Sequence, residues 1–156
     1  MAPPLAFSFD FASPCAYFAL DRVERLAQAH GRAVIWRSML LWAALNAQGA
    51  LSPMQPPAKR AYFLDDIARS AAFLGVVYRA PSRFPLSSHR AARLFYGLGD
   101  GPTARAIGRD VFKAYFAADA DFSDAETLVE IAGRHGVAGL RQLAWRLSGG
   151  PISDQM

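Results

Sequence analysis

Hydrophobic and polar residues alternate at the start of the chain and predict a β-strand there. Apolar side chains occupy every second position from Leu5 to Phe11, with alanine, serine or aspartate between them, and a period of two is typical of a strand. Ser13-Pro14 follows directly. Serine is a preferred helix cap, and the fixed φ of proline suits the first helical position, where no amide donor is needed. A helix is therefore expected to begin at this turn.

The next segments complete a β-α-β unit. Apolar residues recur at helical spacing from Tyr17 to Ala27, and Gly31 is expected to end that helix. Residues 33–36 form a second short apolar run, which predicts another strand. A strand, a helix and a strand in this order predict two parallel strands joined by a right-handed crossover.

Helical patterns dominate the rest of the sequence. An apolar, alanine-rich run at residues 39–45 precedes periodic segments at 58–74, 88–96, 103–118, 124–134 and 140–147. Ser123 and Glu126 have the spacing of a capping box, in which each side chain satisfies a free backbone amide. Two parallel strands are too few for a stable sheet, which usually needs about three. Either the helices carry the fold, or part of the sheet is missing from this chain.

Composition and charge narrow the class of protein. The 156 residues are 53% hydrophobic and 19% charged, enough for about one domain with a buried core, which excludes a disordered chain. The net charge is +4, but the arginines are scattered singly, whereas a nucleic-acid surface needs a clustered basic stripe and a motif. No nucleic-acid partner is expected. The modest positive field suits an anionic small molecule.

Membrane, disulfide and metal functions are not expected. No apolar run approaches the ~18 residues that a membrane span needs, and the first residues lack the basic start of a targeting peptide. A cytoplasmic location follows as the simplest expectation. Cys15 is the single cysteine, which excludes an internal disulfide and a cysteine-based zinc site. His30, His89 and His135 lie far apart in the sequence, and no metal is expected.

The candidate chemistry lies at the start of the first helix, where Ser13 and Cys15 stand. Free backbone amides and the positive end of the helix dipole favour a bound anion or thiolate there. Ser13 either only caps the helix or donates a hydrogen bond to a ligand's thiolate. Cys15 is expected to pack as a small residue; the alternative is a working thiol with a lowered pKa. A two-cysteine redox cycle is excluded, because Cys15 is the single cysteine of the chain.

A second candidate, the adjacent carboxylates Asp65 and Asp66, is interpreted as a solvated surface. Asp66 and Arg69 have the spacing of an ordinary ion pair along a helix. The pair is therefore not expected to form an acid–base site.

The sequence resembles the kappa-class glutathione transferases and the 2-hydroxychromene-2-carboxylate isomerases of the DsbA-like thioredoxin superfamily. The resemblance covers roughly residues 5–140, and its motifs are fairly specific in order and spacing together. The matching residues are Asp10, Ser13, Pro14, Tyr17 and Ala19; Trp36-Arg37 with Leu40-Leu41; Pro57, Lys59, Tyr62, Asp66 and Arg69; Gly75 with Pro81, Phe84 and Pro85; and Phe122-Ser123-Asp124 with Leu128.

The resemblance implies an α/β fold with a thioredoxin-like β-α-β start. Residues 1–37 would form this part of the thioredoxin-like domain, residues 38–150 a large helical insertion, and residues 151–156 a tail. The family closes with two more strands, a cis-proline loop that binds the glutathione backbone, and a final helix. These C-terminal strands are missing from the sequence, so a fragment, a truncated reading frame or strands shared with a partner chain is expected.

The resemblance also implies a glutathione-dependent isomerase that acts on a small conjugated aromatic acid. Ser13 would stabilise the glutathione thiolate, and Lys59 would reach a carboxylate of glutathione or of the substrate. Tyr62 and Phe84 would line the substrate pocket. In such an isomerase the thiolate adds to a conjugated double bond, rotation follows, and elimination releases the other isomer without a redox cofactor or metal. A homodimer is expected. The alternatives are a kappa-class-like transferase and a non-catalytic helical module that binds a partner.

Overall fold

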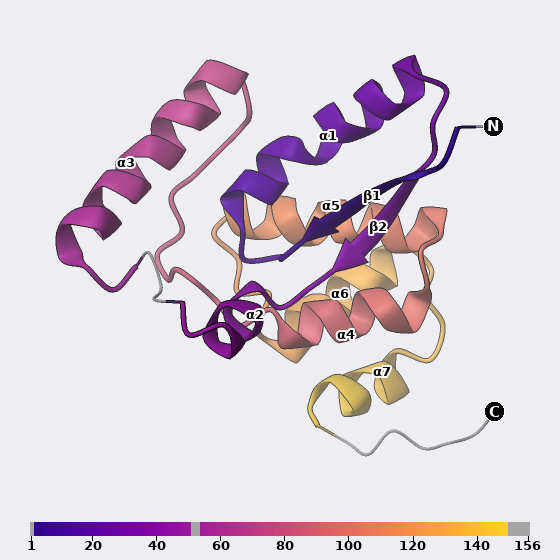
Figure 1. Ribbon diagram of the computed structural model, residues 1–156. Helices are drawn as coiled ribbons and strands as arrows, with labels where there is room; N and C mark the ends of the chain where they lie inside the picture. Colours follow the sequence, from indigo (N-terminus) through magenta and orange to yellow (C-terminus); the bar gives the residue numbers. More distant parts are fainter. Residues whose placement is uncertain (1, 51–53, 150–156) are drawn as a thin grey trace.

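The computed structural model describes residues 2–50 and 54–149. Within these ranges lie two strands and seven helices (Figure 1). In chain order they are β1 (Leu5–Phe9), α1 (Pro14–Ala29), β2 (Val34–Ser38), α2 (Leu41–Ala47), α3 (Pro57–Leu74), α4 (His89–Leu98), α5 (Pro102–Phe116), α6 (Ala125–Arg134) and α7 (Leu140–Leu147). The order confirms the predicted α/β fold, which starts as β-α-β and continues as helices.

The two strands pair in parallel along their whole length, as predicted. β1 ends earlier than the alternating pattern indicated, because the chain turns directly after it. The carboxylate of Asp10 accepts a hydrogen bond from the Ala12 amide at 2.8 Å, and this bond closes the turn. Phe11 therefore lies outside the strand. Its ring is still buried and meets Phe9 edge-on, with centroids 5.1 Å apart.

An aromatic core covers one face of the two-stranded sheet. Helices α1, α4, α5 and α6 supply most of its other side chains. Its large buried residues include Phe9, Phe11, Trp36, Phe95, Ile107, Phe112, Tyr115, Phe116 and Phe122. On the opposite face Ala6, Ser8 and Arg37 are exposed. The core combines residues from the two parts that the sequence analysis expected, residues 1–37 and residues 38–150.

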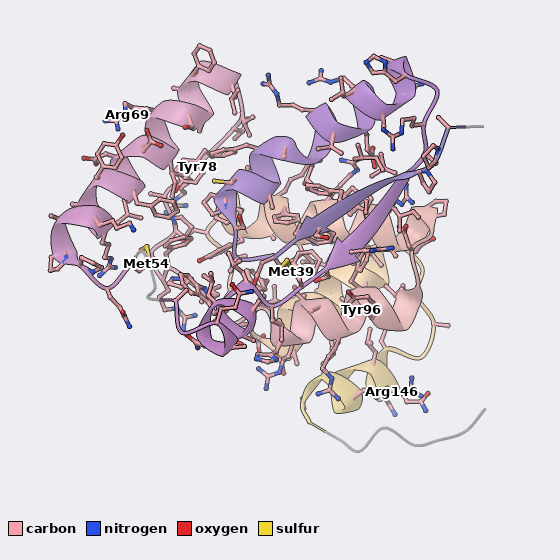
Figure 2. All side chains as sticks on the ribbon, in the orientation of Figure 1. Met39, Met54, Arg69, Tyr78, Tyr96 and Arg146 are labelled. Atoms are coloured by element: carbon pink, nitrogen blue, oxygen red, sulfur yellow. The ribbon has the colours of Figure 1, made fainter. Side chains whose placement is uncertain are left out.

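Polar contacts fix both ends of β2 to the helices. Tyr96 lies on α4 (Figure 2), and its hydroxyl donates a hydrogen bond to the Ser38 carbonyl. At the other end the Arg105 guanidinium donates to the Val34 carbonyl at 2.7 Å. In the middle of the strand the carboxylate of Asp100 accepts a bond from the Trp36 amide at 3.0 Å. Arg105 of α5 forms an ion pair with Asp100 at 2.6 Å. The loop between α4 and α5 therefore holds the strand in register.

Helix α3 stands beside α1 at the edge of the molecule (Figure 1). Ile67 and Ala71 of α3 pack against Phe18 of α1 and form a small second core. Gly75 ends the helix in the left-handed conformation, with φ 65°, where a side chain would be strained. The predicted helix over residues 58–74 is thus confirmed.

The predicted capping box at the start of α6 is wrong. Asp124, not Ser123, caps this helix and accepts a hydrogen bond from the Thr127 amide at 3.1 Å. Ser123 is held away because its amide donates to the carboxylate of Asp121 at 2.9 Å, and its hydroxyl donates to the same oxygen. The local competition for Ser123 decides which residue caps the helix.

In residues 2–50 and 54–149, none of the helices combines the length and apolar character that crossing a membrane would require. The predicted tail, residues 151–156, lies outside the described residues.

Candidate functional site

The turn between β1 and α1 presents Ser13 at the start of the helix. The Ser13 amide donates to the Asp10 carbonyl at 2.9 Å, and the residue adopts the extended conformation of a helix cap. Its Oγ accepts a hydrogen bond from the Ala16 amide at 3.3 Å, and Pro14 takes the first helical position. The predicted helix cap is confirmed. Because a serine hydroxyl can accept and donate at once, the same group keeps a proton to offer a ligand.

Ser13 borders a small aromatic cavity of about 70 Å³. The turn before α1, helix α2, helix α3 and the loop before α4 all contribute to its wall. The lining residues are Asp10, Ala12, Ser13, Pro14, Leu41, Trp42, Leu45, Phe63 and Phe84. The structure thus brings Ser13 and Phe84, two of the predicted site residues, to the same cavity. Trp42 and Phe63 are aromatic neighbours that the sequence analysis did not assign to a site.

Lys59 and Tyr62 lie on α3 outside the lining of this cavity. Lys59 is exposed and stands one turn before Phe63, so both project from the same side of the helix. Tyr62 is 65% exposed, and the Arg69 guanidinium lies 5.4 Å from the centre of its ring. Arg69 also pairs with Asp66 at 3.2 Å, as the spacing predicted. The binding roles of Lys59 and Tyr62 stay predictions.

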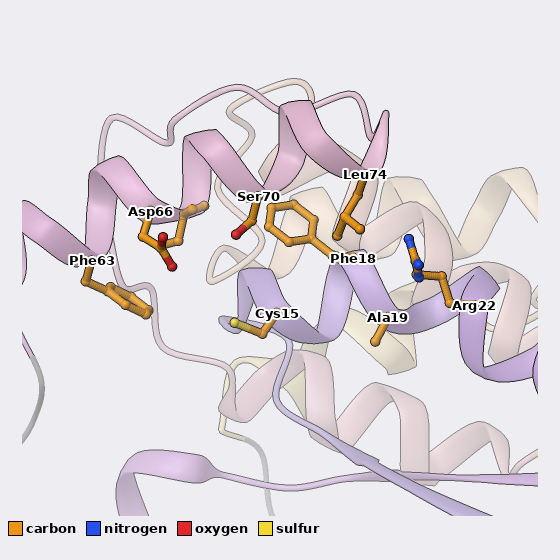
Figure 3. Close-up of a pocket in the computed structure, with 9 residues that line it drawn as sticks. Cys15, Phe18, Ala19, Arg22, Phe63, Asp66, Ser70 and Leu74 are labelled. Atoms are coloured by element: carbon orange, nitrogen blue, oxygen red, sulfur yellow. The ribbon is translucent and has the colours of Figure 1, made fainter.

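A second cavity of about 280 Å³ lies between α1 and α3 (Figure 3). Its wall is mostly apolar, with Cys15 and Phe63 at one end and Arg22 at the other (Figure 3). Asp66 and Ser70 of α3 supply polar groups. Phe63 therefore separates this cavity from the one beside Ser13 and lines both. Only the packing of α3 on α1 creates the cavity, so no sequence motif marks it.

The structure corrects the expectation that Cys15 is packed inside the protein, because the residue is exposed. Partial burial of the sulfur raises the pKa of the Cys15 thiol, and the nearby carboxylate of Asp66 raises this pKa further. A hydrogen bond from the backbone amide of Cys15 itself lowers the pKa but is the smallest effect. The start of the helix therefore does not yield a low-pKa thiol. At neutral pH the group is a protonated thiol rather than a nucleophilic thiolate.

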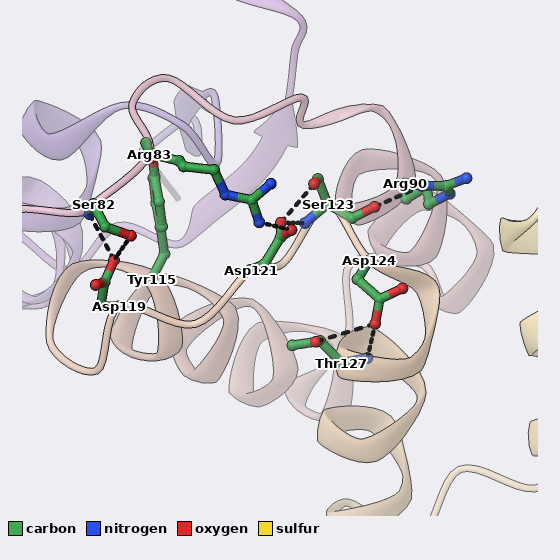
Figure 4. Close-up of polar contacts among 9 residues, drawn as sticks. All are labelled: Ser82, Arg83, Arg90, Tyr115, Asp119, Asp121, Ser123, Asp124 and Thr127. Atoms are coloured by element: carbon green, nitrogen blue, oxygen red, sulfur yellow. Dashed lines mark hydrogen bonds and ion pairs between the residues drawn. The ribbon is translucent and has the colours of Figure 1, made fainter.

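A polar cluster anchors the loop that carries Phe84 (Figure 4). The Tyr115 hydroxyl donates to the Arg83 carbonyl at 2.8 Å, and the Arg83 side chain forms an ion pair with Asp121. The Ser82 amide donates to Asp119 at 2.7 Å. This bond is the main cause of the lowered pKa of the Asp119 carboxyl. The cluster fixes Phe84 at the wall of the Ser13 cavity.

The three histidines do not form a cluster. His30 and His135 are the C-terminal caps of α1 and α6, and His135 Nε2 lies 2.8 Å from a carboxylate oxygen of Asp110. His89 is exposed at the first turn of α4. Across the part of the chain that the structure describes, no group of three or more His, Cys, Asp and Glu side chains could hold a metal ion.

A family model for the DSBA-like thioredoxin domain matches residues 5–148 of the sequence. The chain belongs to this family. This DSBA-like chain has a single cysteine, Cys15, with Ser13 and Ala16 near it at the start of α1. The two-cysteine redox cycle is therefore absent from the helix start, and Ser13 is the polar side chain that remains.

Two solved structures have folds similar to that of this chain. A 2-hydroxychromene-2-carboxylate isomerase superposes with a TM-score of 0.77 at 27% sequence identity, over 92% of this chain and 70% of that chain. A probable DsbA oxidoreductase from Streptomyces coelicolor gives a TM-score of 0.67 at 22% identity, over 95% of this chain and 68% of that chain. No curated protein matches the sequence significantly. These likenesses confirm the resemblance stated from the sequence motifs.

Proposed function

We propose that the chain is a glutathione-dependent isomerase of the 2-hydroxychromene-2-carboxylate type, acting on a small conjugated aromatic acid. One observation carries the proposal. Ser13 stands at the start of α1, on a cavity whose wall holds the aromatic side chains of Trp42, Phe63 and Phe84. The similarity to an isomerase of this type, at 27% identity, supports the same reaction class.

The residues at the start of α1 suit the thiol end of glutathione. Ser13 uses one lone pair to cap the helix and keeps its proton, and the positive end of the helix dipole favours a thiolate at this place. The cavity of about 70 Å³ is too small for a whole tripeptide, so most of glutathione and of the substrate would extend beyond it. Lys59, exposed near the start of α3, supplies a cation for a carboxylate outside the cavity.

Bound glutathione would supply a thiolate that adds reversibly to a conjugated double bond, permits rotation about it and leaves again. The protein's own part is to hold that sulfur and the substrate. The Ser13 hydroxyl donates its proton as a hydrogen bond to the thiolate and lowers the thiol's pKa. Phe63 and Phe84 offer ring faces to a flat aromatic substrate. The centres of the two rings lie 6.4 Å apart on the wall of the cavity.

The test follows the double-bond geometry of conjugated aromatic acids by ultraviolet absorbance, with and without reduced glutathione. Isomerisation is expected only with glutathione, and free thiol is recovered in full, whereas a transferase would consume it. Ser13→Ala should slow the reaction about 100-fold, because it removes a donor to a negatively charged atom. Ser8→Ala, at an exposed serine of β1, serves as the control and keeps the full rate. Isomerisation that is independent of glutathione, or unchanged in Ser13→Ala, refutes the proposal.

A further inference from the structure

A third cavity, larger than the two described above, lies on a different side of α1. It has a volume of about 610 Å³ and is formed by α1, α5 and residues 75–77, which follow α3. Ser13 and Phe84 do not line it. Arg22 is also at the edge of the Cys15 cavity and stands between the two. This cleft is separate from the proposed glutathione site.

Four basic side chains line the cleft. Arg22 and Arg25 are three residues apart on α1, and Arg109 and Lys113 are four apart on α5. At these spacings both members of a pair project from one side of their helix. The packing of α1 against α5 then turns the two basic faces toward one cavity.

Only one of these four cations is neutralised. Arg109 forms ion pairs with Asp21, at 2.6 Å, and with Glu24. Arg22, Arg25 and Lys113 form no ion pair with any carboxylate in the described part of the chain. Asp21 also lines the cleft, and when the carboxylates of Asp21 and Glu24 are counted, the four cations leave a local net charge of +2.

The rest of the cleft wall is largely apolar, and a hydrogen bond holds one segment of it in place. The Tyr17 hydroxyl donates to the Val77 carbonyl at 2.9 Å and holds residues 75–77 against α1. Leu20, Leu74 and Val76 also line the cleft. The cavity therefore exists before a ligand binds, so that little binding energy is lost in ordering it.

We propose that this cleft binds a small organic polyanion, a compact molecule with at least two phosphate or carboxylate groups. The planar guanidinium groups of Arg22 and Arg25 match the two oxygens of either group, and the ammonium of Lys113 adds a point charge from the facing helix. The apolar wall contacts the carbon body of the ligand. Phosphates and carboxylates share this chemistry, and the choice of probe distinguishes them.

The first measurement is calorimetric titration at low ionic strength with inorganic pyrophosphate, citrate and acetate as probes. Pyrophosphate or citrate should bind saturably with one site per chain, and acetate, with a single charge, should not. If pyrophosphate binds more tightly than citrate, the cleft is assigned to phosphate ligands; if citrate binds more tightly, it is assigned to carboxylate ligands. Absence of saturable binding for both polyanions overturns the proposal.

Two matched double variants separate a site from general attraction between charges. Arg25→Ala with Lys113→Ala removes two cations from the cleft and should weaken binding about tenfold or more. Arg93→Ala with Arg141→Ala removes the same charge from exposed positions on α4 and α7 and should leave binding unchanged. All four side chains are exposed on helices, where alanine is favourable. Arg25→Glu, with the reversed charge, provides a second test and should abolish binding. Equal weakening in both double variants overturns the proposal.

Discussion

The carboxylate of Asp10 accepts a hydrogen bond from the backbone amide of Leu41 at 2.7 Å, and so joins the turn before α1 to the first residue of α2. Its other oxygen accepts the bond from Ala12. Asp10 is only 3% exposed, so water cannot replace either partner. One buried carboxylate thus holds both Ser13 and the α2 side chains of the Ser13 cavity in place.

Replacing Asp10 by asparagine should destabilise the fold. The new NH₂ group would face a backbone N–H, leaving a buried amide without an acceptor. We expect a loss of about 1–3 kcal/mol in the free energy of unfolding, measured by urea denaturation. Asp65→Asn, at an exposed position of α3, is the matched control and should change stability far less. Equal effects of the two substitutions would contradict this role of Asp10.

Ser13 should contribute to stability through its cap as well as to the proposed chemistry. Ser13→Ala removes the acceptor for the Ala16 amide and should cost about 1 kcal/mol. Ser13→Thr keeps a hydroxyl acceptor and should retain most of that stability. Thermal unfolding of the three proteins checks this prediction. If the threonine variant is less stable than the alanine variant, the cap hydrogen bond is not the main contribution of Ser13 to stability.

Cys15 should react slowly with an alkylating reagent at neutral pH, and faster as the pH rises. The raised pKa of its thiol leaves little thiolate at pH 7. Because the Asp66 carboxylate contributes to the rise, Asp66→Asn should lower the pKa and speed labelling by iodoacetamide at pH 7. Asp65→Asn, one residue away, should have a smaller effect. A fast rate that does not change with pH would restore the alternative of a reactive thiolate.

The ion pair and hydrogen bonds of Asp121 should make the stability of the fold depend on pH in the acidic range. Burial raises the pKa of this carboxyl, but hydrogen bonds from Ser123 and the Arg83 guanidinium outweigh burial and lower it below 3.8. A lowered pKa in the folded state contributes stability above pH 3.8, and the contribution disappears as the pH falls through the folded value. The melting temperatures of the wild type and Asp121→Asn should therefore differ at pH 6 and converge below pH 3.8. A constant difference would contradict the contribution of the ionised carboxylate.

The β-α-β start was predictable because its signals are local. Alternating residues, Ser13-Pro14 and Gly31 each act on neighbours in the chain. The end of β1 was misplaced because the Asp10 side chain, not the hydrophobic pattern, turns the chain before Phe11. The cap of α6 was misassigned because Asp121 competes for Ser123.

The site was only partly predictable, because its cavities depend on contacts between distant segments. Ser13 carried a signal in its turn and its family motif. Phe63 carried none, since its position on both cavities follows from how α3 packs on α1. The exposure of Cys15 has the same origin, because residue type alone favours burial.

The central claim, that Ser13 holds the thiol of glutathione, is tested most directly by calorimetric titration of the chain with reduced glutathione. Saturable binding is expected for the wild type and for Ser8→Ala, with about tenfold weaker binding for Ser13→Ala and recovery in Ser13→Thr. Lys59→Gln should weaken binding by a smaller factor if the ammonium meets a carboxylate. Binding that Ser13→Ala leaves unchanged, or its absence at millimolar glutathione in the folded wild type, would contradict the account.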